Sequence, residues 1–526
     1  MPRLTPHRYL PATAAVLVAA LALSACSASS GDTEAGASGG GTLRTLLTTD
    51  PSTFDPATAT GGDDYVMDRL LYDSLLRRDD DGLVGGLASS WEAESASEYV
   101  FTIRDDATCS DGTEITPAVV ADSLTYFASP DTASSFRALV FGSGTATITA
   151  DDATGTVRIS LSEPYANLER GLTIAQSGII CPAGLEDLEG LAAGTVEGAF
   201  SGPYTLTESQ AGIGYTLTLR DDYDAWPEFA SPLTGSPASS IELSLATDAS
   251  TTANQLLSGD LDAANLTGDT VDRFASNTDY TQTPTVAAGV YVIFNEQEGS
   301  VFAGNAELRK AVAQAIDQEA YNEVFSDGRS ELFTSVVSSS YACVNTDTSL
   351  LEAHDPAAAA SVLGGASIRL VQSTAFGDAG AGGEYIQQAL TEAGASVELT
   401  STDNATWATT INTPGSGWDM TIMGDINAVQ TISASLERVM GTSIAEGGRS
   451  IGAADNVEGA AALAEGLATA DPDEQCAAFQ TAQETMLERD DVVPLAGLIT
   501  TMVTGPGVTV RAFGDYLDPA TFRFSE

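Results

Sequence analysis

Apolar and polar positions follow two different periods along the chain. Residues 43–47 alternate, which predicts a strand, and the apolar residues of 66–75 recur at helical spacing, which predicts a helix after it. The same alternation over 91–104 predicts another strand. The longest amphipathic pattern covers 308–325 and predicts one long helix.

The second half of the chain alternates between strand and helix patterns. The predicted order is strand, helix, strand, helix, strand, at residue 368, 384–393, 397–399, around Trp407 and 420–423. Such alternation is typical of a parallel or mixed sheet covered by helices. A last helix is predicted from Pro472 to about residue 489, followed by strands over 494–503. These patterns place the chain in the α/β class.

The first 25 residues have the pattern of an export signal. They carry two cations, Arg3 and Arg8, and an apolar run over 12–23 that is too short to span a bilayer as a mature helix. The run ends in Leu-Ser-Ala-Cys, which resembles the lipobox of bacterial lipoproteins, with Cys26 as the lipidated residue. The alternative is a plain secretory signal with an accidental cysteine. Residues 27–41 are rich in Ser, Gly and Ala and predict a flexible tether.

Composition and charge exclude several kinds of function. The chain has 526 residues, of which 43% are apolar and 18% charged, so it has enough apolar material for large packed domains. Because 21 basic residues face 73 acidic ones, for a net charge of −52, we expect no nucleic-acid partner and no preference for anionic ligands. Two histidines and the single Lys310 exclude a His-rich metal site and a P-loop lysine, and no cofactor is expected.

Eight short motifs, in a fixed order, resemble those of a known family. They lie at 53–56 (TFDP), 71–75 (LYDSL), 86–91 (GLASSW), 101–104 (FTIR), 110–116 (SDGTEIT), 201–204 (SGPY), 257–262 (LSGDLD) and 308–317 (LRKAVAQAID). Their order and spacing are similar to those of the extracytoplasmic solute-binding proteins of ABC importers, in the peptide/nickel class, family 5. The most specific run is SDGTEIT, in which Glu114 replaces the family's usual proline.

The resemblance implies a bilobal α/β fold like that of periplasmic binding proteins, with two mixed-sheet lobes joined by a hinge. Lobe I would cover 42–290, with an inserted subdomain at about 74–185. Lobe II would cover 291–491, and 492–526 would return to the hinge and lobe I. The signal peptide would be 1–25, and 26–41 the lipidated cysteine with its linker.

The implied function is capture of a small solute by hinge closure and its delivery to ABC permease subunits with their ATPases. The resemblance favours an oligopeptide ligand, and the chain would be a monomer, held by lipid on the outer face of the cytoplasmic membrane. A non-peptide solute such as a metal chelate or a sugar is the alternative. A binder that signals or scavenges without transport also stays open.

The family's ligand contacts map onto two regions of this chain. The first is the loop after TFDP, and the second is the pair of elements that carries Trp407 and the following strand. The residues implied are Thr60, Gly61, Gly62, Asp63, Asp64, Trp407, Trp418, Asp425 and Asn427. The sequence departs from the peptide binders here, because Asp425 stands where they have Trp, and Ala428 stands where an acid would hold the peptide ammonium.

Four cysteines beyond Cys26 permit three disulfide connectivities. If the lobes divide as the resemblance implies, Cys109 with Cys181 and Cys343 with Cys476 each stay within one lobe, which favours this pairing. Buried reduced thiols are the alternative. We expect no enzyme, because a Ser-His-Asp triad would have to use His354, which stands beside Asp355-Pro356 at a predicted helix start. An exported glycosidase, which needs only two carboxylates, is the remaining enzymatic alternative.

Overall fold

The computed structural model describes residues 40–80, 82–246, 248–377, 380–446 and 448–525. The expected signal peptide, Cys26 and nearly all of the predicted linker lie outside these residues. Within them, no helix is long and apolar enough to cross a membrane.

A first sheet has the order β1 (Gly40–Leu47), β10 (Ala238–Leu245), β9 (Gly214–Leu219) and β8 (Tyr204–Gln210). Strands β1 and β10 are parallel, and the other neighbours are antiparallel. The alternation in β1 turns Leu43 and Leu47 inward, where they share a core with Leu70 and Leu71 of α1 (Gly62–Leu71). Helix α1 is therefore held against the first sheet by a shared apolar core.

A second sheet is wholly antiparallel, in the order β4 (Ala88–Ser95), β5 (Glu98–Ile103), β7 (Thr156–Leu161) and β6 (Ala146–Asp151). The prediction of one strand over 91–104 is wrong, because the chain reverses at Ala96 and Ser97. Apolar alternation continues through both arms of this hairpin, so the period alone does not mark the turn. Helix α2 (Pro117–Ala128) packs against β6 and β7, with Thr116 as its N-cap.

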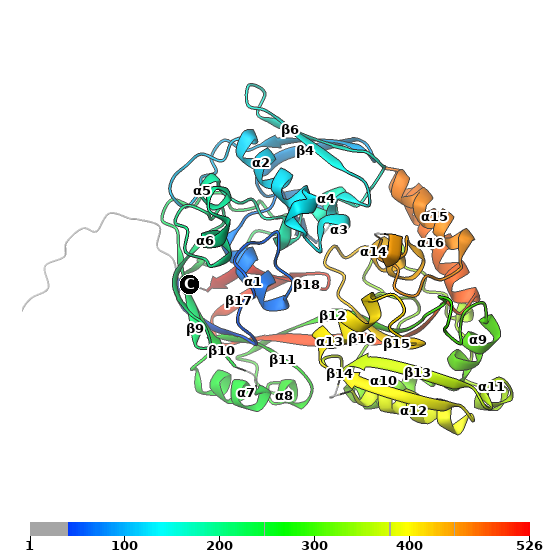
Figure 1. Cartoon of the computed structure of the whole chain (residues 1–526). Coiled ribbons are helices and arrows are strands. Elements are labelled where there is room, and N and C mark those ends of the chain that lie inside the picture. The colour runs from blue at the N-terminus through cyan, green and yellow to red at the C-terminus, as the bar shows by residue number, and fades with distance from the viewer. Residues whose placement is uncertain (1–39, 81, 247, 378–379, 447, 526) are drawn as a thin grey trace, which may run out of the picture. The chain divides into compact units, whose positions relative to one another are not determined.

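The largest sheet has six strands. Its order is β11 (Ala263–Leu266), β16 (Val492–Thr504), β12 (Thr281–Phe294), β15 (Met420–Asp425), β13 (Ser367–Ser373) and β14 (Ser396–Thr402). Strand β13 is parallel to β14 and β15, and the rest of the sheet is antiparallel. The mixed sheet predicted from the sequence is confirmed. Helix α12 (Ala381–Glu392) lies against β13 and β14, and α10 (Gln318–Ser326) lies beside α12 and contacts β16 (Figure 1).

Strands β12 and β16 connect two separate apolar cores. Leu495 and its neighbours at the start of β16 pack with Val290 and Phe294 of β12. Met502, near the end of β16, packs instead with Leu43 of the first sheet. The pairing of β12 with β16 is interrupted by two register shifts, one between Val286 and Ala288, which lies between the two cores, and one between Val290 and Tyr291.

The predicted helix over 308–325 is two helices, α9 (Ala306–Ala315) and α10. Ile316 is extended, and the Asp317 carboxylate accepts hydrogen bonds from the N–H groups of Glu319 and Ala320. Asp317 therefore caps the second helix, which ends the first one without a Gly or Pro in the sequence.

The remaining elements connect or cover these sheets. The strands are β2 (Leu76–Asp79), β3 (Gly82–Gly85), β17 (Val508–Phe513) and β18 (Tyr516–Phe524). The helices are α3 (Arg137–Phe141), α4 (Leu168–Gly171), α5 (Pro182–Glu186), α6 (Leu188–Ala192), α7 (Ala249–Ser258), α8 (Asp269–Asp272), α11 (Pro356–Leu363), α13 (Asn404–Asn412), α14 (Ile432–Met440), α15 (Val457–Ala468) and α16 (Pro472–Glu488).

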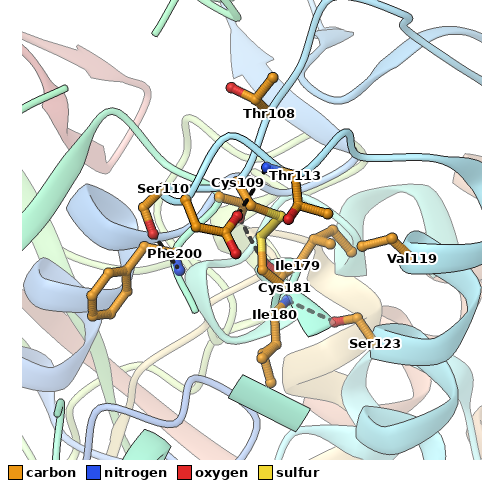
Figure 2. Close-up of a disulfide and its surroundings, with 12 residues drawn as sticks. Thr108, Cys109, Ser110, Thr113, Val119, Ser123, Ile179, Ile180, Cys181 and Phe200 are labelled. Carbon is orange, nitrogen blue, oxygen red and sulfur yellow. Dashed lines mark hydrogen bonds between the residues drawn. A yellow bond between two sulfur atoms is a disulfide. The ribbon is translucent and has the colours of Figure 1, made fainter. Parts of the chain in front are cut away.

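Two disulfides join the cysteine pairs that the sequence analysis favours. Cys109 bonds to Cys181 with their Cα atoms 6.0 Å apart, and Cys343 bonds to Cys476 with theirs 4.8 Å apart. Around the first pair, the backbone of Ser110 bonds to Phe200, and the N–H of Ile180 donates to the Ser123 hydroxyl of α2 (Figure 2). This disulfide therefore fixes the segment at 109–113 to the segment at 179–181.

Asp68 is a buried carboxyl group in α1. It is fully buried, and neither of its side-chain oxygens has a hydrogen-bond partner among the described residues. Burial, together with the nearby carboxylates Asp64 and Asp55, raises the pKa of Asp68 well above its ordinary value. The folded chain therefore keeps the Asp68 proton at pH values at which the unfolded chain releases it.

We expect Asp68→Asn to stabilise the chain at neutral pH. As pH rises above the unfolded pKa of about 4, the wild-type free energy of unfolding falls by up to about 1.4 kcal/mol per pH unit, because unfolding releases the proton. The amide removes this loss, so urea unfolding at pH 4 and pH 7 should show a variant whose advantage grows with pH. Asp221→Asn, at an exposed position, is the control. A difference that does not change with pH would contradict the assignment.

Candidate functional site

The loop at 60–64 uses its own carboxylates to fold. The Asp64 side chain is buried and accepts the N–H groups of Thr60 and Gly61 at 3.0 and 2.8 Å. Asp63 accepts hydrogen bonds from the N–H and hydroxyl groups of Thr48 and Thr49. Thr60, Gly61 and Gly62 remain exposed. The loop thus offers backbone to a ligand, while its two acids serve as local structure.

Both candidate tryptophans lie in the core. Trp407 is 5% exposed and Trp418 is 2% exposed. The indole N–H of Trp407 donates to the Thr421 hydroxyl at 2.8 Å, and its ring packs edge-on against Phe376. An indole held by a hydrogen bond and by apolar neighbours has a complete structural role without a ligand. The ligand contacts proposed for these residues stay predictions.

Asp425 and Asn427 organise the segment that follows β15. The Asp425 carboxylate, 2% exposed, accepts a hydrogen bond from Arg438 at 2.6 Å and one from the Tyr291 hydroxyl at 3.2 Å. The Asn427 amide donates to the Thr431 carbonyl at 2.6 Å and to the Ser435 hydroxyl. The charge of Asp425 is therefore compensated by Arg438, so a ligand ammonium would have to compete with a guanidinium for it.

The segment 428–434 meets the segment 165–173 through polar and apolar contacts. The Asn167 amide donates to the Ser433 hydroxyl at 2.9 Å, and both residues are buried. Close by, the N–H of Ala166 donates to the Leu467 carbonyl at 2.9 Å. Val429 and Ala434 are part of the apolar core around the second sheet. Residues more than 250 positions apart thus form one buried interface.

Next to this interface lies a group of four residues that we call the arginine–tyrosine cluster: Tyr65, Arg69, Arg78 and Tyr516. They come from α1, from β2 and from the start of β18. The Arg78 guanidinium lies 4.3 Å from the centroid of the Tyr516 ring, and the Tyr65 ring meets Tyr516 edge-on at 5.6 Å. Arg69 lies 6.0 Å from the same centroid. The Tyr516 ring is therefore the centre of the cluster.

Hydrogen bonds fix both guanidinium groups in place. Arg78 donates from Nε to the Thr173 hydroxyl at 3.2 Å and from Nη2 to the Ala428 carbonyl. Arg69 donates to the Ser74 hydroxyl and to the Thr173 carbonyl. Arg78 thereby links β2 to the segment after β15, 350 positions away. Burial lowers the pKa of Arg78, although a guanidinium stays charged at neutral pH.

Four polar atoms of the cluster have no partner among the described residues. They are buried, and they are Arg78 Nη1, Arg69 Nε and the hydroxyl oxygens of Tyr65 and Tyr516. Sequence reasoning missed this cluster. The available signal was the pair Arg77-Arg78 directly after LYDSLL, in a chain with few basic residues. Arg77 bonds to Asp73 and Asp518, which leaves Arg78 as the member of the pair without an acid.

Comparison with known proteins gives one family and several relatives. The model of bacterial extracellular solute-binding proteins, family 5, middle, matches residues 82–445. The curated relative named "Probable D,D-dipeptide-binding periplasmic protein DdpA", from Escherichia coli K12, is 32% identical over 193 residues, which is 33% of this chain. The match spans only 35% of the length of that relative.

Two solved structures match over nearly the whole chain. A substrate binding protein from Microbacterium hydrocarbonoxydans, complexed with 4-hydroxybenzoate hydrazide, is 40% identical, with 92% of this chain and 100% of that chain covered and a TM-score of 0.81. DppA from Helicobacter pylori, in complex with the peptide STSA, is 18% identical, with 93% and 99% covered and a TM-score of 0.76. The predicted fold class, α/β of the bilobal periplasmic-binding-protein type, is confirmed by these matches.

A pair of substitutions separates the two roles considered for Trp407. Because its indole is buried in the core, we expect Trp407→Ala to lower the free energy of unfolding by about 3–5 kcal/mol. Trp407→Phe keeps most of the apolar contact and should cost less, although it leaves the Thr421 hydroxyl without its indole donor. Urea unfolding of both variants measures this. An alanine variant as stable as the wild type that has lost solute binding would show that the indole contacts ligand.

Proposed function

This chain belongs to the bacterial extracellular solute-binding proteins of family 5, and we propose that it captures a small solute between two lobes and delivers it to the permease of an ABC importer. The observation that supports capture is that the two apolar cores are joined by continuous strands at one place and by non-covalent contacts at another. Strands β12 and β16 connect two separate cores, while 165–173 and 428–434 meet only through side-chain and backbone contacts. The non-covalent contacts between 165–173 and 428–434 can break and form again, whereas the chain through β12 and β16 cannot.

The proposed lobes are 42–290 with the return segment 492–526, and 291–491. The antiparallel sheet β4–β7 falls within the proposed inserted subdomain at 74–185, and the parallel pair β13–β14 falls within lobe II. The register shift near Val286 lies between the two cores, and Gly289 pairs with Gly497 beside it. This is where we propose that the two strands bend when the lobes move.

Closure coupled to binding follows from the energetics of two states. A solute that makes contacts to both lobes has its higher affinity for the closed state, and it shifts the balance toward that state by the difference in affinity. The closed state is what we propose the permease recognises. The lipid anchor at Cys26, the position outside the cytoplasmic membrane and the monomeric state belong to the same proposal.

An oligopeptide is the first candidate solute, as for the relatives whose names specify a D,D-dipeptide or a bound peptide. A small aromatic acyl compound is the second. It is favoured by the 40% identical protein with its bound 4-hydroxybenzoate hydrazide, and by the pairing of Asp425 with Arg438, which removes a free acid from this region. We propose capture without chemical conversion. The only described histidine, His354, is half-exposed beside Asp317 on the surface.

We expect the Asn167–Ser433 contact to contribute to affinity through closure. Removing one hydrogen bond of this kind costs about 0.5–1.5 kcal/mol, so Asn167→Ala should weaken binding by about 2- to 10-fold. Ser433→Ala should do the same, and the double variant should lose less than the sum, because both single changes remove the same side-chain contact. Calorimetric titration with 4-hydroxybenzoate hydrazide and with the dipeptide Met-Leu measures the effect.

Asn404→Ala, at an exposed position of α13, is the matched control and should leave affinity unchanged. Small-angle X-ray scattering of the chain from residue 27 onward should show a smaller radius of gyration with solute than without. An unchanged radius with a bound solute would contradict capture by closure, and additive effects of the two single variants would contradict the role of the pair.

A further inference from the structure

We propose that the arginine–tyrosine cluster binds a carboxylate of the captured solute, so that the ligand class is small solutes with a free carboxylate group. This inference rests on the proposed function, since it names the chemistry of the solute that the two lobes would enclose. An organic acid and the C-terminus of a short peptide share this chemistry. The experiment below has one arm for each.

Buried arginines of this chain differ in whether they have an acid partner, and this difference is the first argument for a carboxylate ligand. Arg77 pairs with Asp73 and Asp518, and Arg309 pairs with Glu296 and Asp491, all of them buried. Arg69 and Arg78 are equally buried, at 0% and 2% exposed, yet neither has a carboxylate within 4.0 Å among the described residues.

The absence of a partner acid at these two positions does not reflect a shortage of acids. The chain has 73 acidic residues against 21 basic ones, and buried Arg77 and Arg309 are paired with acids, whereas buried Arg523 is held by two backbone carbonyls. A buried charge without a counter-charge at contact distance destabilises the folded chain. A carboxylate brought by the solute would compensate Arg78, whose pKa burial lowers, whereas Arg69 also feels the charge of Asp518.

The geometry of the cluster atoms that have no hydrogen-bond partner among the described residues is the second argument. Arg78 is held through Nε and Nη2, so its third nitrogen, Nη1, is oriented and still able to donate. The other atoms of the cluster without a partner in the described part of the chain are Arg69 Nε and the hydroxyl oxygens of Tyr65 and Tyr516, whose ring centroids lie 5.6 Å apart. Guanidinium and hydroxyl donors suit a carboxylate, and they disfavour an ammonium group.

The hydrogen bond from Arg78 to the Ala428 carbonyl is the third argument. It joins β2 to the segment after β15, so the orientation of the guanidinium depends on the contact between these two parts of the chain. A solute that binds Nη1 and the contact that holds Nη2 would therefore stabilise each other. The net charge of −52 predicts against anionic ligands, but charges on the surface are screened by salt, whereas Arg78 would act at contact distance inside the protein.

Calorimetric titration of the wild-type chain with matched pairs of probes tests the assignment. The first pair is 4-hydroxybenzoate and its methyl ester, and the second is the dipeptide Met-Leu and its C-terminal amide. At least one free acid should bind, and blocking its carboxylate should weaken binding by about 10-fold or more. The pair that shows this difference identifies the source of the carboxylate.

Variants of Arg78 locate the effect. Arg78→Gln should weaken the free acid by about 10- to 100-fold and should abolish the difference between the acid and its blocked form. Arg78→Lys, which keeps the charge, should retain part of the preference for the acid. Arg523→Gln is the matched control, because Arg523 is also buried and stacks on an aromatic ring, that of Trp226, but its bonds go to the carbonyls of Ala520 and Phe522.

Two results would overturn the inference, and they differ in what they say of the proposed function. Equal binding of acids and blocked forms by the wild type would remove the carboxylate assignment and leave solute capture intact. Binding of no acid would also remove it, and a thermal shift with neutral 4-hydroxybenzoate hydrazide then decides whether capture stands. If Arg78→Gln does not fold, the wild-type pairs and the lysine variant still give the answer.

Discussion

Strands β12 and β16 pair along a ladder whose two ends belong to different apolar cores. At one end Val290 and Leu495 are buried together, and at the other Met502 packs with the first sheet. The ladder has two register shifts, one between Val286 and Ala288 and one between Val290 and Tyr291, and the first is where we propose that the two strands bend. The contact of 165–173 with 428–434 and the bond from Arg78 to the Ala428 carbonyl depend on this constraint, since each joins residues from both sides of it.

Buried charge is distributed unevenly over this framework. Asp425 is compensated by Arg438, and Arg77 by Asp73 and Asp518, so these groups are complete without a ligand. Arg78 is instead held by a hydroxyl and a carbonyl and keeps an unpartnered nitrogen. At Arg78, whose remaining nitrogen has no partner among the described residues, we infer that the solute supplies the acid. The proposed function and the proposed ligand class therefore come from the same few contacts.

The sequence predicted the fold better than it predicted the site. Helix and strand periods gave the mixed sheet, but they could not locate the hairpin turn at Ala96 or the break at Asp317, because apolar spacing continues across both. Side-chain partners are not visible in a period. Trp407 and Asp425 therefore read as free to bind ligand, whereas the structure gives them Thr421 and Arg438. That Arg78 has no acid partner in the described part of the chain could be recognised only from the positions of the side chains around it.

The most direct test is a crystal structure of the chain from residue 27 onward, grown with 4-hydroxybenzoate and, separately, with Met-Leu. The account predicts a solute carboxylate within hydrogen-bond distance of Arg78 Nη1, enclosed by contacts to both proposed lobes, with Asn167 bonded to Ser433. A carboxylate bound elsewhere while Arg78 takes a protein acid as its partner would contradict it.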